Sequence, residues 1–232
     1  MSKIYISPST QEKNTYINGG TEEFWMNKIA DVLVPLLKNS GFTVYRNRPE
    51  MNLKQIVDDS NSKKVDFHFA IHSNAGGGTG AEVFCHKFGG VGEKFARLLY
   101  NDISIITPTS DRGVKQGFNN YGEGKHMYEL ANTDASSALV EIDFHDNPVT
   151  AEWITSNIEL IAKIFAKSIC KHFGVKLWEL DEKSDVELLV DELVKHGIFT
   201  NNQYWVNVLE GRQVVNLEYL KIAFSRSLNK MN

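Results

Sequence analysis

The sequence predicts an α/β fold in which a mostly parallel sheet is flanked by helices. Short β-favouring apolar runs alternate with amphipathic helical patterns over about the first 175 residues. Parallel strands need crossover connections, which helices supply, and such sheets are covered on both faces. The chain has 232 residues, 42% of them hydrophobic, so it is long enough to bury a core of this kind.

The individual elements follow from apolar spacing and from turn residues. Five segments have the length and composition of strands, at 3–7, 42–46, 65–71, 81–84 and 138–142. Helical spacing predicts four helices, at 22–40, 53–62, 93–105 and, as one long helix, 151–173. Thr21 is the expected N-cap of the first helix. The Gly-, Asn- and Thr-rich stretch 108–124 is expected to be a surface loop.

A change in composition after Trp178 predicts a second, smaller part. We expect a catalytic domain at 1–175, a polar linker at 176–184 and a small C-terminal module at 185–232 with two or three short helices. The module is below the usual size for an independent core, so it is expected to dock on the first domain or to bind something.

Charge and composition exclude several classes of protein. The net charge is −4, so no excess of positive charge exists to bind nucleic acid or an anionic membrane. Cys85 and Cys170 lie far apart, which argues against a disulfide framework or a cysteine zinc site. No apolar run is long enough for a membrane span or a signal peptide. We therefore expect synthesis in the cytoplasm without a Sec signal.

Polar residues at the carboxyl ends of the predicted strands are the first candidates for a site, because ligands bind there in open parallel sheets. Gln11 follows the first strand, Glu23 stands in the first turn of the next helix, and His72 ends its strand. Glu141 lies inside an apolar strand, where an ionised carboxylate costs several kcal/mol unless it is paired or binds a metal. A structural ion pair is the alternative explanation for Glu141. His68, one pleat deeper than His72, is expected to be structural.

A glutamate, a histidine and a second glutamate from separate strand ends are able to meet at one metal ion. Nitrogen and oxygen ligands with an open water position and a nearby carboxylate base are typical of catalytic zinc sites. Spacing alone does not prove that they meet.

The order of several motifs resembles one enzyme family. The sequence runs Lys-Ile-Tyr-Ile-Ser7, Glu23-Phe-Trp-Met-Asn-Lys, Phe-Ala-Ile-His72-Ser-Asn-Ala, Gly80-Ala-Glu-Val-Phe, Asp111-Arg-Gly-Val-Lys and Leu-Val-Glu141-Ile-Asp-Phe-His-Asp-Asn. Over residues 1–175 this order resembles the zinc-dependent N-acetylmuramoyl-L-alanine amidases of the Amidase_3 type. The resemblance implies a six-stranded α/β domain that cleaves the amide between N-acetylmuramic acid and L-alanine in peptidoglycan.

The resemblance also implies roles for individual residues. Glu23 and His72 match zinc ligands, and Glu141 matches the catalytic glutamate that moves a proton from water to the leaving amine. We expect Asn74 and Arg112 to contact the substrate, with Arg112 paired to a stem-peptide carboxylate. A solvated loop arginine is the alternative for Arg112.

One position departs from the family pattern. The family's first zinc ligand is a histidine after the first strand, whereas this chain has no histidine before His68. Gln11 is the favoured substitute, through its amide oxygen, although zinc usually takes Cys, His, Asp or Glu. The alternatives are that His145 or His126 fills the gap, with Asp143 on the same strand face also able to approach, or that the site is degenerate.

The sequence thus predicts a zinc-dependent peptidoglycan amidase, typical of a phage or prophage endolysin that acts at the bacterial wall after release. Its partner is peptidoglycan, and nucleic acid and membrane are not expected. The C-terminal module resembles, more weakly, small helical modules of cell-wall enzymes, with core packing as the alternative role for its aromatic residues. The rival function is a catalytically impaired protein that still binds peptidoglycan.

Overall fold

The computed structural model describes residues 1–109, 112–178 and 185–231. The chain divides into two compact units, Met1–Trp178 and Glu179–Asn232. Most of the linker expected at 176–184 lies outside the described residues. The two units are described separately.

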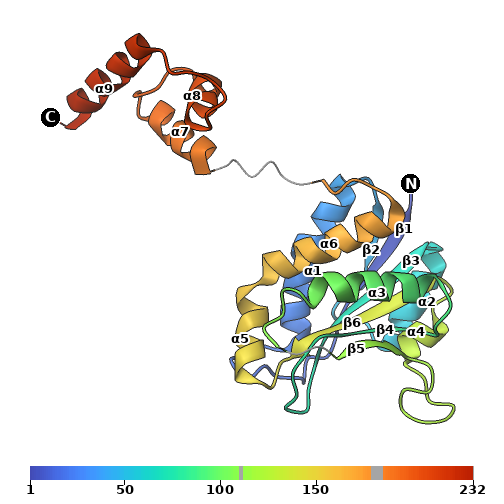
Figure 1. Cartoon of the computed structure of the whole chain (residues 1–232). Helices are drawn as coiled ribbons and strands as arrows, with labels where there is room; N and C mark the ends of the chain where they lie inside the picture. The colour runs from blue at the N-terminus through green and yellow to red at the C-terminus, as the bar shows by residue number, and fades with distance from the viewer. Residues whose placement is uncertain (110–111, 179–184, 232) are drawn as a thin grey trace. The chain divides into compact units, whose positions relative to one another are not determined.

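A six-stranded sheet forms the centre of the first unit (Figure 1). Its strand order is β2-β1-β3-β6-β4-β5. The strands are β1 (Lys3–Pro8), β2 (Thr43–Arg46), β3 (Phe67–Asn74), β4 (Glu82–Cys85), β5 (Gly113–Gln116) and β6 (Ser136–Phe144). All neighbouring strands are parallel except β4 and β6, which are antiparallel. The predicted mostly parallel α/β architecture is confirmed.

Helices cover both faces of this sheet. One face packs on α1 (Glu22–Asn39), α3 (Val91–Ile103), α5 (Pro148–Ser156) and α6 (Ile158–Phe173). The other face packs on α2 (Leu53–Lys63) and the short α4 (Tyr128–Asn132). Because the strands are covered on both faces, their sequences are nearly continuous apolar runs.

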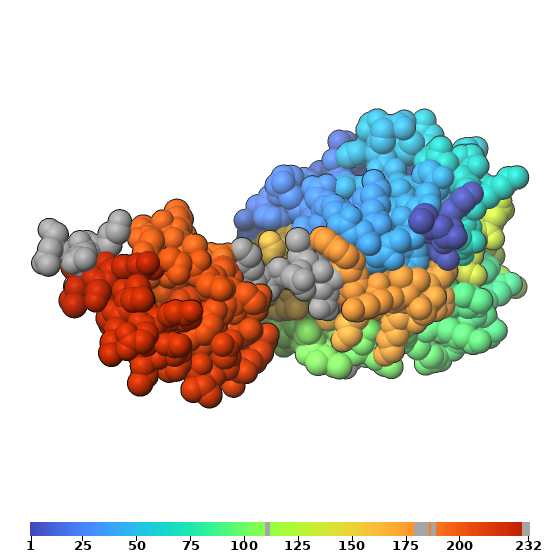
Figure 2. All heavy atoms as spheres, turned by 90° about the horizontal axis from the view of Figure 1, so that it is seen from above, coloured from blue at the N-terminus to red at the C-terminus, as the bar shows by residue number. Residues whose placement is uncertain are grey.

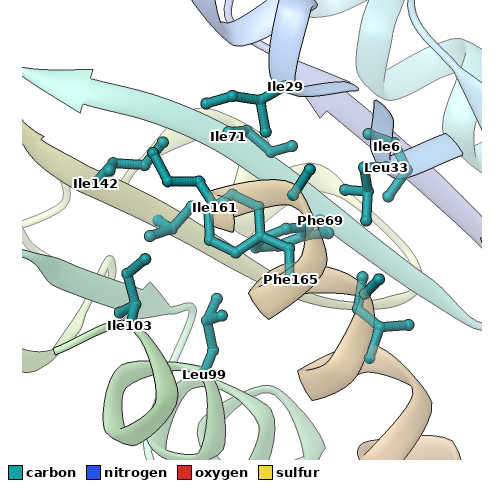
Figure 3. Packing of buried hydrophobic residues seen from close by; sticks show 14 of the residues in the cluster. Ile6, Ile29, Leu33, Phe69, Ile71, Leu99, Ile103, Ile142, Ile161 and Phe165 are labelled. Carbon is teal, nitrogen blue, oxygen red and sulfur yellow. The ribbon is translucent and has the colours of Figure 1, made fainter. Parts of the chain in front are cut away.

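The main core lies between the sheet and the larger helical layer (Figure 3). Phe69 of β3 packs edge-to-face on Phe165 of α6, with ring centroids 5.2 Å apart. Ile6 and Leu33, which join β1 to α1, are fully buried in the same cluster. This packing fixes the first turn of α1 and the end of β3, the two places from which the site is built.

The structure corrects the sequence analysis in two elements. The expected loop at 108–124 contains β5, an edge strand whose only apolar residue is Val114. The expected long helix at 151–173 is two helices, because Asn157 leaves the helical conformation (φ −124°, ψ 28°). The Asn157 side chain donates to the carbonyl of Trp153, so a local side-chain bond replaces the helical continuation.

The second unit is a small helical fold, with its atoms drawn in orange to red in Figure 2. Its helices are α7 (Asp185–Lys195), α8 (Asn202–Leu209) and α9 (Leu217–Met231). Trp205 is buried and stacks on Phe199, with centroids 4.1 Å apart. Trp205 therefore serves the core of this unit, as the core-packing alternative expected.

None of the helices in the described parts of the chain combines the length and the apolar composition that a membrane span requires.

Candidate active site

The site lies at one edge of the sheet, where β1, β3 and β6 end and β4 and β5 begin. His72 of β3 is the register partner of Glu141 of β6, and Glu141 is the partner of Glu82 of β4. Partners on neighbouring strands point to the same face, so these three side chains form a row across the sheet. The β4–β6 pair is antiparallel, which brings the beginning of β4 to the ends of β3 and β6.

Glu22, in the first turn of α1, contacts His72 from across this edge. Thr21 caps the helix by accepting the N–H of Phe24 at 3.2 Å, which fixes the first turn. The Glu22 carboxylate is 1% exposed, and its Oε1 lies 2.8 Å from Nδ1 of His72. Burial alone would raise the pKa of Glu22, but the His72 hydrogen bond holds it below its usual value. Burial alone would lower the pKa of His72, and Glu22 raises it to about 9.

The structure places Glu22, and not Glu23, at His72. Glu23 is only partly buried, and its backbone carbonyl accepts a hydrogen bond from Asn27. One residue along a helix is a rotation of about 100°, which takes the Glu23 side chain away from the sheet edge. A signal for Glu22 was present in the sequence, because it shares its helical face with Met26 and Ile29, both of which are fully buried.

Gln11 lies next to this pair, as expected for the residue that follows the first strand. Its Nε2 is 3.4 Å from Nδ1 of His72, and its Oε1 accepts a hydrogen bond from Asn14 at 2.7 Å. Asn14 also donates to Oε2 of Glu22 at 2.7 Å. The structure therefore brings Gln11, Glu22 and His72 together.

Glu141 is partly buried, and one of its carboxylate oxygens is unsatisfied. Its Oε2 is inaccessible to solvent and has no hydrogen-bond partner among the described residues. Burial raises the pKa of Glu141 to about 8; the positive charge of His72 opposes this shift, and Glu22 and Glu82 add to it. A carboxyl group with a pKa near the working pH can lose its proton, accept one from water and return it. The structure shows no ion pair for Glu141 among the described residues.

A pocket of about 330 Å³ opens beside these residues. Gln11, His72 and Glu141 line one part of it. The rest of its lining comes from the end of β1, from α2 and from the segment before and within α4, including Leu53, Tyr121, Tyr128 and Glu129. The pocket is large enough for a peptide-sized group, and its polar end coincides with the row of charged side chains.

The other residues considered for the missing ligand lie elsewhere. His145 bonds Ser73 through Nδ1 at 3.0 Å and stacks on Tyr16. Asp143 accepts the N–H of Gly80 at 2.8 Å and the hydroxyl of Thr109 at 2.6 Å. His126 accepts the backbone N–H of Asn119 at 3.0 Å. Among the described residues none of these three contacts His72, whereas Gln11 does.

Asn74 and Arg112, the expected substrate contacts, both bond Glu82. Nδ2 of Asn74 donates to Oε1 of Glu82 at 2.5 Å, and Nε of Arg112 donates to Oε2 at 3.1 Å. Lys115 donates to the same Oε2. Glu82 and Lys115 were not predicted as site residues, although Glu82, like Glu141, is a charged residue within an apolar strand.

A second histidine and glutamate pair lies further back along β3 than His72, and its glutamate, Glu129, also lines the pocket. His68 is fully buried, with Nε2 2.7 Å from Oε1 of Glu129 and Nδ1 2.9 Å from the hydroxyl of Ser60. Ser7 donates to the same oxygen of Glu129. Both nitrogens of His68 are satisfied, which agrees with the structural role expected for it.

The side chains around His72 include ligand types that zinc binds. In the described parts of the chain, no three His, Cys, Asp or Glu side chains form a metal-binding group. Glu22 and His72 supply two ligand types that zinc prefers, and the Gln11 carboxamide, whose oxygen is a weaker type of zinc ligand, lies beside them. With the unsatisfied Glu141 oxygen nearby, this set fits a catalytic zinc site that has an open position.

Comparison with known proteins identifies the family. The family model described as N-acetylmuramoyl-L-alanine amidase, Amidase_3, matches residues 6–171. The chain belongs to the Amidase_3 family. The match covers every residue of the site described above and the whole sheet apart from the first three residues of β1.

Individual relatives agree with this assignment. N-acetylmuramoyl-L-alanine amidase CwlM of Bacillus licheniformis is 29% identical over 155 residues, which are 65% of this chain. The aligned part spans 54% of that relative, about half of its length.

Solved amidase structures share the fold of this chain. The catalytic domain of CwlV from Bacillus (Paenibacillus) polymyxa var. colistinus has a TM-score of 0.65 at 20% identity, covering 76% of this chain and all of that one. AmiC2 of Nostoc punctiforme has a TM-score of 0.65 at 18% identity, covering 75% and 97%. The catalytic domain of the CD27L endolysin has a TM-score of 0.60 at 19% identity, covering 74% and 98%.

Proposed function

We propose that the chain is a zinc-dependent peptidoglycan hydrolase that cleaves the amide between N-acetylmuramic acid and L-alanine. The observation that carries this proposal is the position of Glu141, whose buried and unsatisfied oxygen lies beside the His72–Glu22 pair at a pocket. Family membership supports the reaction type.

In this mechanism Glu22 and His72 would hold the metal, and Gln11 would be the third ligand. A bound zinc ion supplies polarisation of the scissile carbonyl and lowers the pKa of water. Asn14, which bonds both Gln11 and Glu22, orients these two ligands. Glu22 takes the role that the sequence analysis assigned to Glu23.

Glu141 acts as the base and then as the acid. It removes a proton from the attacking water and delivers it to the nitrogen of L-alanine as the carbon–nitrogen bond breaks. Burial supports both steps, because it brings the pKa of Glu141 close to the working pH. The packed strand fixes the carboxylate, since its neighbours Val140 and Ile142 are fully buried.

The proposal extends to biological setting. The enzyme is proposed to act at the bacterial cell wall as an endolysin of a phage or prophage. The helical unit Glu179–Asn232 is proposed to bind wall polymer, supported by its separation from the catalytic unit and by the half-exposed Tyr219 beside a pocket of about 270 Å³.

The test is release of free L-alanine amino groups from purified peptidoglycan by the full chain, with added zinc and with chelator. The wild type is expected to release them only with zinc. Glu141→Gln is expected to lower the rate by about 10²–10⁴-fold, the usual size of a general acid–base contribution. Glu23→Gln is the matched control and should leave the rate within about 3-fold. Release that is insensitive to both chelator and Glu141→Gln would contradict the proposal.

Gln11 favours a second candidate, a peptidoglycan-binding protein with impaired catalysis. An amide oxygen is an unusual zinc ligand, so a chain with Gln11 is able to keep the pocket while losing the metal. Co-sedimentation with peptidoglycan that is unaffected by chelator, without any release of amino groups, would support this function over the first.

A further inference from the structure

A buried carboxylate with two cations lies directly beside the proposed catalytic glutamate. Glu82, the first residue of β4, is 3% exposed and is the cross-strand partner of Glu141. It accepts hydrogen bonds from Asn74, Arg112 and Lys115. The single negative charge of Glu82 is thus paired with the two positive charges of Arg112 and Lys115. This cluster of three side chains therefore carries one excess positive charge.

The two cations are half-exposed and partly unused. Both side chains are 38% exposed. Arg112 bonds Glu82 through Nε, and its two terminal nitrogens have no hydrogen-bond partner among the described residues. Its guanidinium lies 5.1 Å from the ring centroid of Phe144, which limits its movement. Arg112 therefore presents a fixed pair of free donors toward solvent, the arrangement that binds a carboxylate in a bidentate manner.

Stability alone does not explain this cluster. A buried ion pair is often no more stable than apolar residues of the same volume, because the charges must be desolvated. Here the desolvated carboxylate is matched by more positive charge than it needs. Asn74 donates to the other oxygen of Glu82, so the group that fixes the cations is itself held in place.

The distance from Glu141 suits a second binding point on the same substrate. Neighbouring strands lie about 4.8 Å apart, so β5 lies roughly 10 Å from β6. Lys115 of β5 and Arg112, the residue before β5, both bond Glu82 on β4, the strand between β5 and β6. An extended peptide advances about 3.4 Å per residue, so the α-carboxylate of the second residue lies roughly 7 Å from the scissile nitrogen. The cations are within reach of that group.

We propose that Arg112 and Lys115, held by Glu82, form a carboxylate-binding subsite for the second residue of the stem peptide. This residue is a γ-linked D-glutamate, whose α-carboxyl is either free or amidated. The subsite selects the free carboxylate over the carboxamide. The inference rests on the proposed function and adds the chemical form of the preferred stem peptide to it.

The test compares N-acetylmuramoyl-L-alanyl-γ-D-glutamate with N-acetylmuramoyl-L-alanyl-D-isoglutamine, which differ only in this group. Cleavage by the zinc-loaded full chain is measured as kcat/KM, and binding to the full-length Glu141→Gln variant is measured by calorimetry. We expect about 10-fold or greater preference for the carboxylate compound in both measurements, the value of one hydrogen bond to a charged group.

Variants of the cations locate the preference. Arg112→Gln and Lys115→Gln should each lower kcat/KM and affinity for the carboxylate compound by about 10-fold or more, and change those for the carboxamide by less than about 3-fold. Arg97→Gln on α3, which also removes an exposed cation paired with a glutamate, is the matched control. Thermal unfolding of each variant shows whether the fold is retained.

The outcomes separate the two proposals. Equal binding and equal cleavage of the two compounds by the wild type would overturn the subsite and leave the amidase proposal intact. A second outcome is that the protein binds the carboxylate compound more tightly than the carboxamide, that Arg112→Gln abolishes this difference, and that neither compound is cleaved. This outcome would support the subsite and contradict the amidase proposal. If Arg112→Gln and Lys115→Gln lowered kcat/KM and affinity equally for both compounds, the subsite would be overturned, because a general structural role of the two cations would explain the losses.

Discussion

Two histidines on β3, four residues apart, each contact a buried glutamate, and the two clusters differ in how completely their polar atoms are satisfied. The lower cluster consists of His68, Glu129, Ser60 and Ser7. In it, both ring nitrogens of His68 are hydrogen-bonded, and Glu129 accepts hydrogen bonds from His68 and Ser7. The upper cluster consists of His72, Glu22, Gln11 and Glu141. In it, an oxygen of Glu141 lacks any partner among the described residues, and the Gln11 nitrogen is 3.4 Å from His72. Burial is common to both, so burial alone does not mark a chemical site.

The pKa directions follow the same division. Burial would raise the pKa of Glu129, but the His68 hydrogen bond lowers it, whereas the pKa of Glu141 rises to about 8. The lower cluster thus stabilises the negative charge of Glu129, whereas the upper cluster leaves the Glu141 carboxyl able to exchange a proton. Three variants, used in four experiments, challenge this comparison.

The largest effect is expected from Glu22→Gln in the upper cluster. Loss of the carboxylate removes one of the two strong metal donors, so we expect zinc affinity and amidase rate to fall at least 100-fold. Thermal stability should change little, because Gln keeps the shape and a hydrogen bond to Asn14. Equilibrium dialysis against zinc and rate measurements check this result, with Glu23→Gln beside it as the control. If Glu23→Gln, and not Glu22→Gln, lost the metal, the assignment of Glu22 would be wrong.

The lower cluster should respond in the opposite way. Glu129→Leu leaves the buried donors of His68 and Ser7 without an acceptor, at about 1–3 kcal/mol for each. We therefore expect a large loss in the free energy of unfolding, measured in urea, and an amidase rate per folded molecule that changes much less. A rate that falls more than the folded fraction would place Glu129 in the reaction.

The same variant has a pH dependence with a defined sign. The pKa of Glu129 is lower in the folded state, so its contribution to stability is fully present above the unfolded value of about 4.5 and is lost as pH falls below it. The stability difference between wild type and Glu129→Leu should shrink below about pH 4.5. A difference that stays constant down to pH 3 would contradict the ion pair.

The smallest effect is expected from Gln11→His, which adds the imidazole that the family pattern has at this point. An imidazole is a better zinc ligand than a carboxamide, so zinc affinity should rise about 10-fold while the rate at saturating zinc changes little. Competition with a zinc chelator measures the affinity. No change would show that Gln11 does not contribute to metal binding.

The central elements of the fold could be predicted because their apolar patterns are strong. The strands around Ile6, Phe69 and Val140 are buried on both faces, and their sequences show this. β5 could not be predicted, because an edge strand of four residues with one apolar side chain carries almost no pattern. The helix break at Asn157 depends on one local hydrogen bond, which periodicity does not contain.

Part of the candidate site could be predicted from the sequence, with Glu23 named in place of Glu22 and with Glu82 and Lys115 missed. His72 and Glu141 stand at strand ends, where position along the chain also fixes position in space. Glu22 and Glu23 differ by rotation about a helix axis, and only the burial of Met26 and Ile29 on the same face distinguishes them. Glu82 depends on the reversed direction of β4, a property of the topology that no local pattern shows.

The reversal of β4 also separates two tasks along the chain. The side chains proposed for bond cleavage come from where β1, β3 and β6 end and from the start of α1, whereas those proposed for recognition come from where β4 and β5 begin. Exchange of the β4–β5 segment between relatives is therefore a route by which a new wall chemistry could be acquired without rebuilding the machinery of hydrolysis.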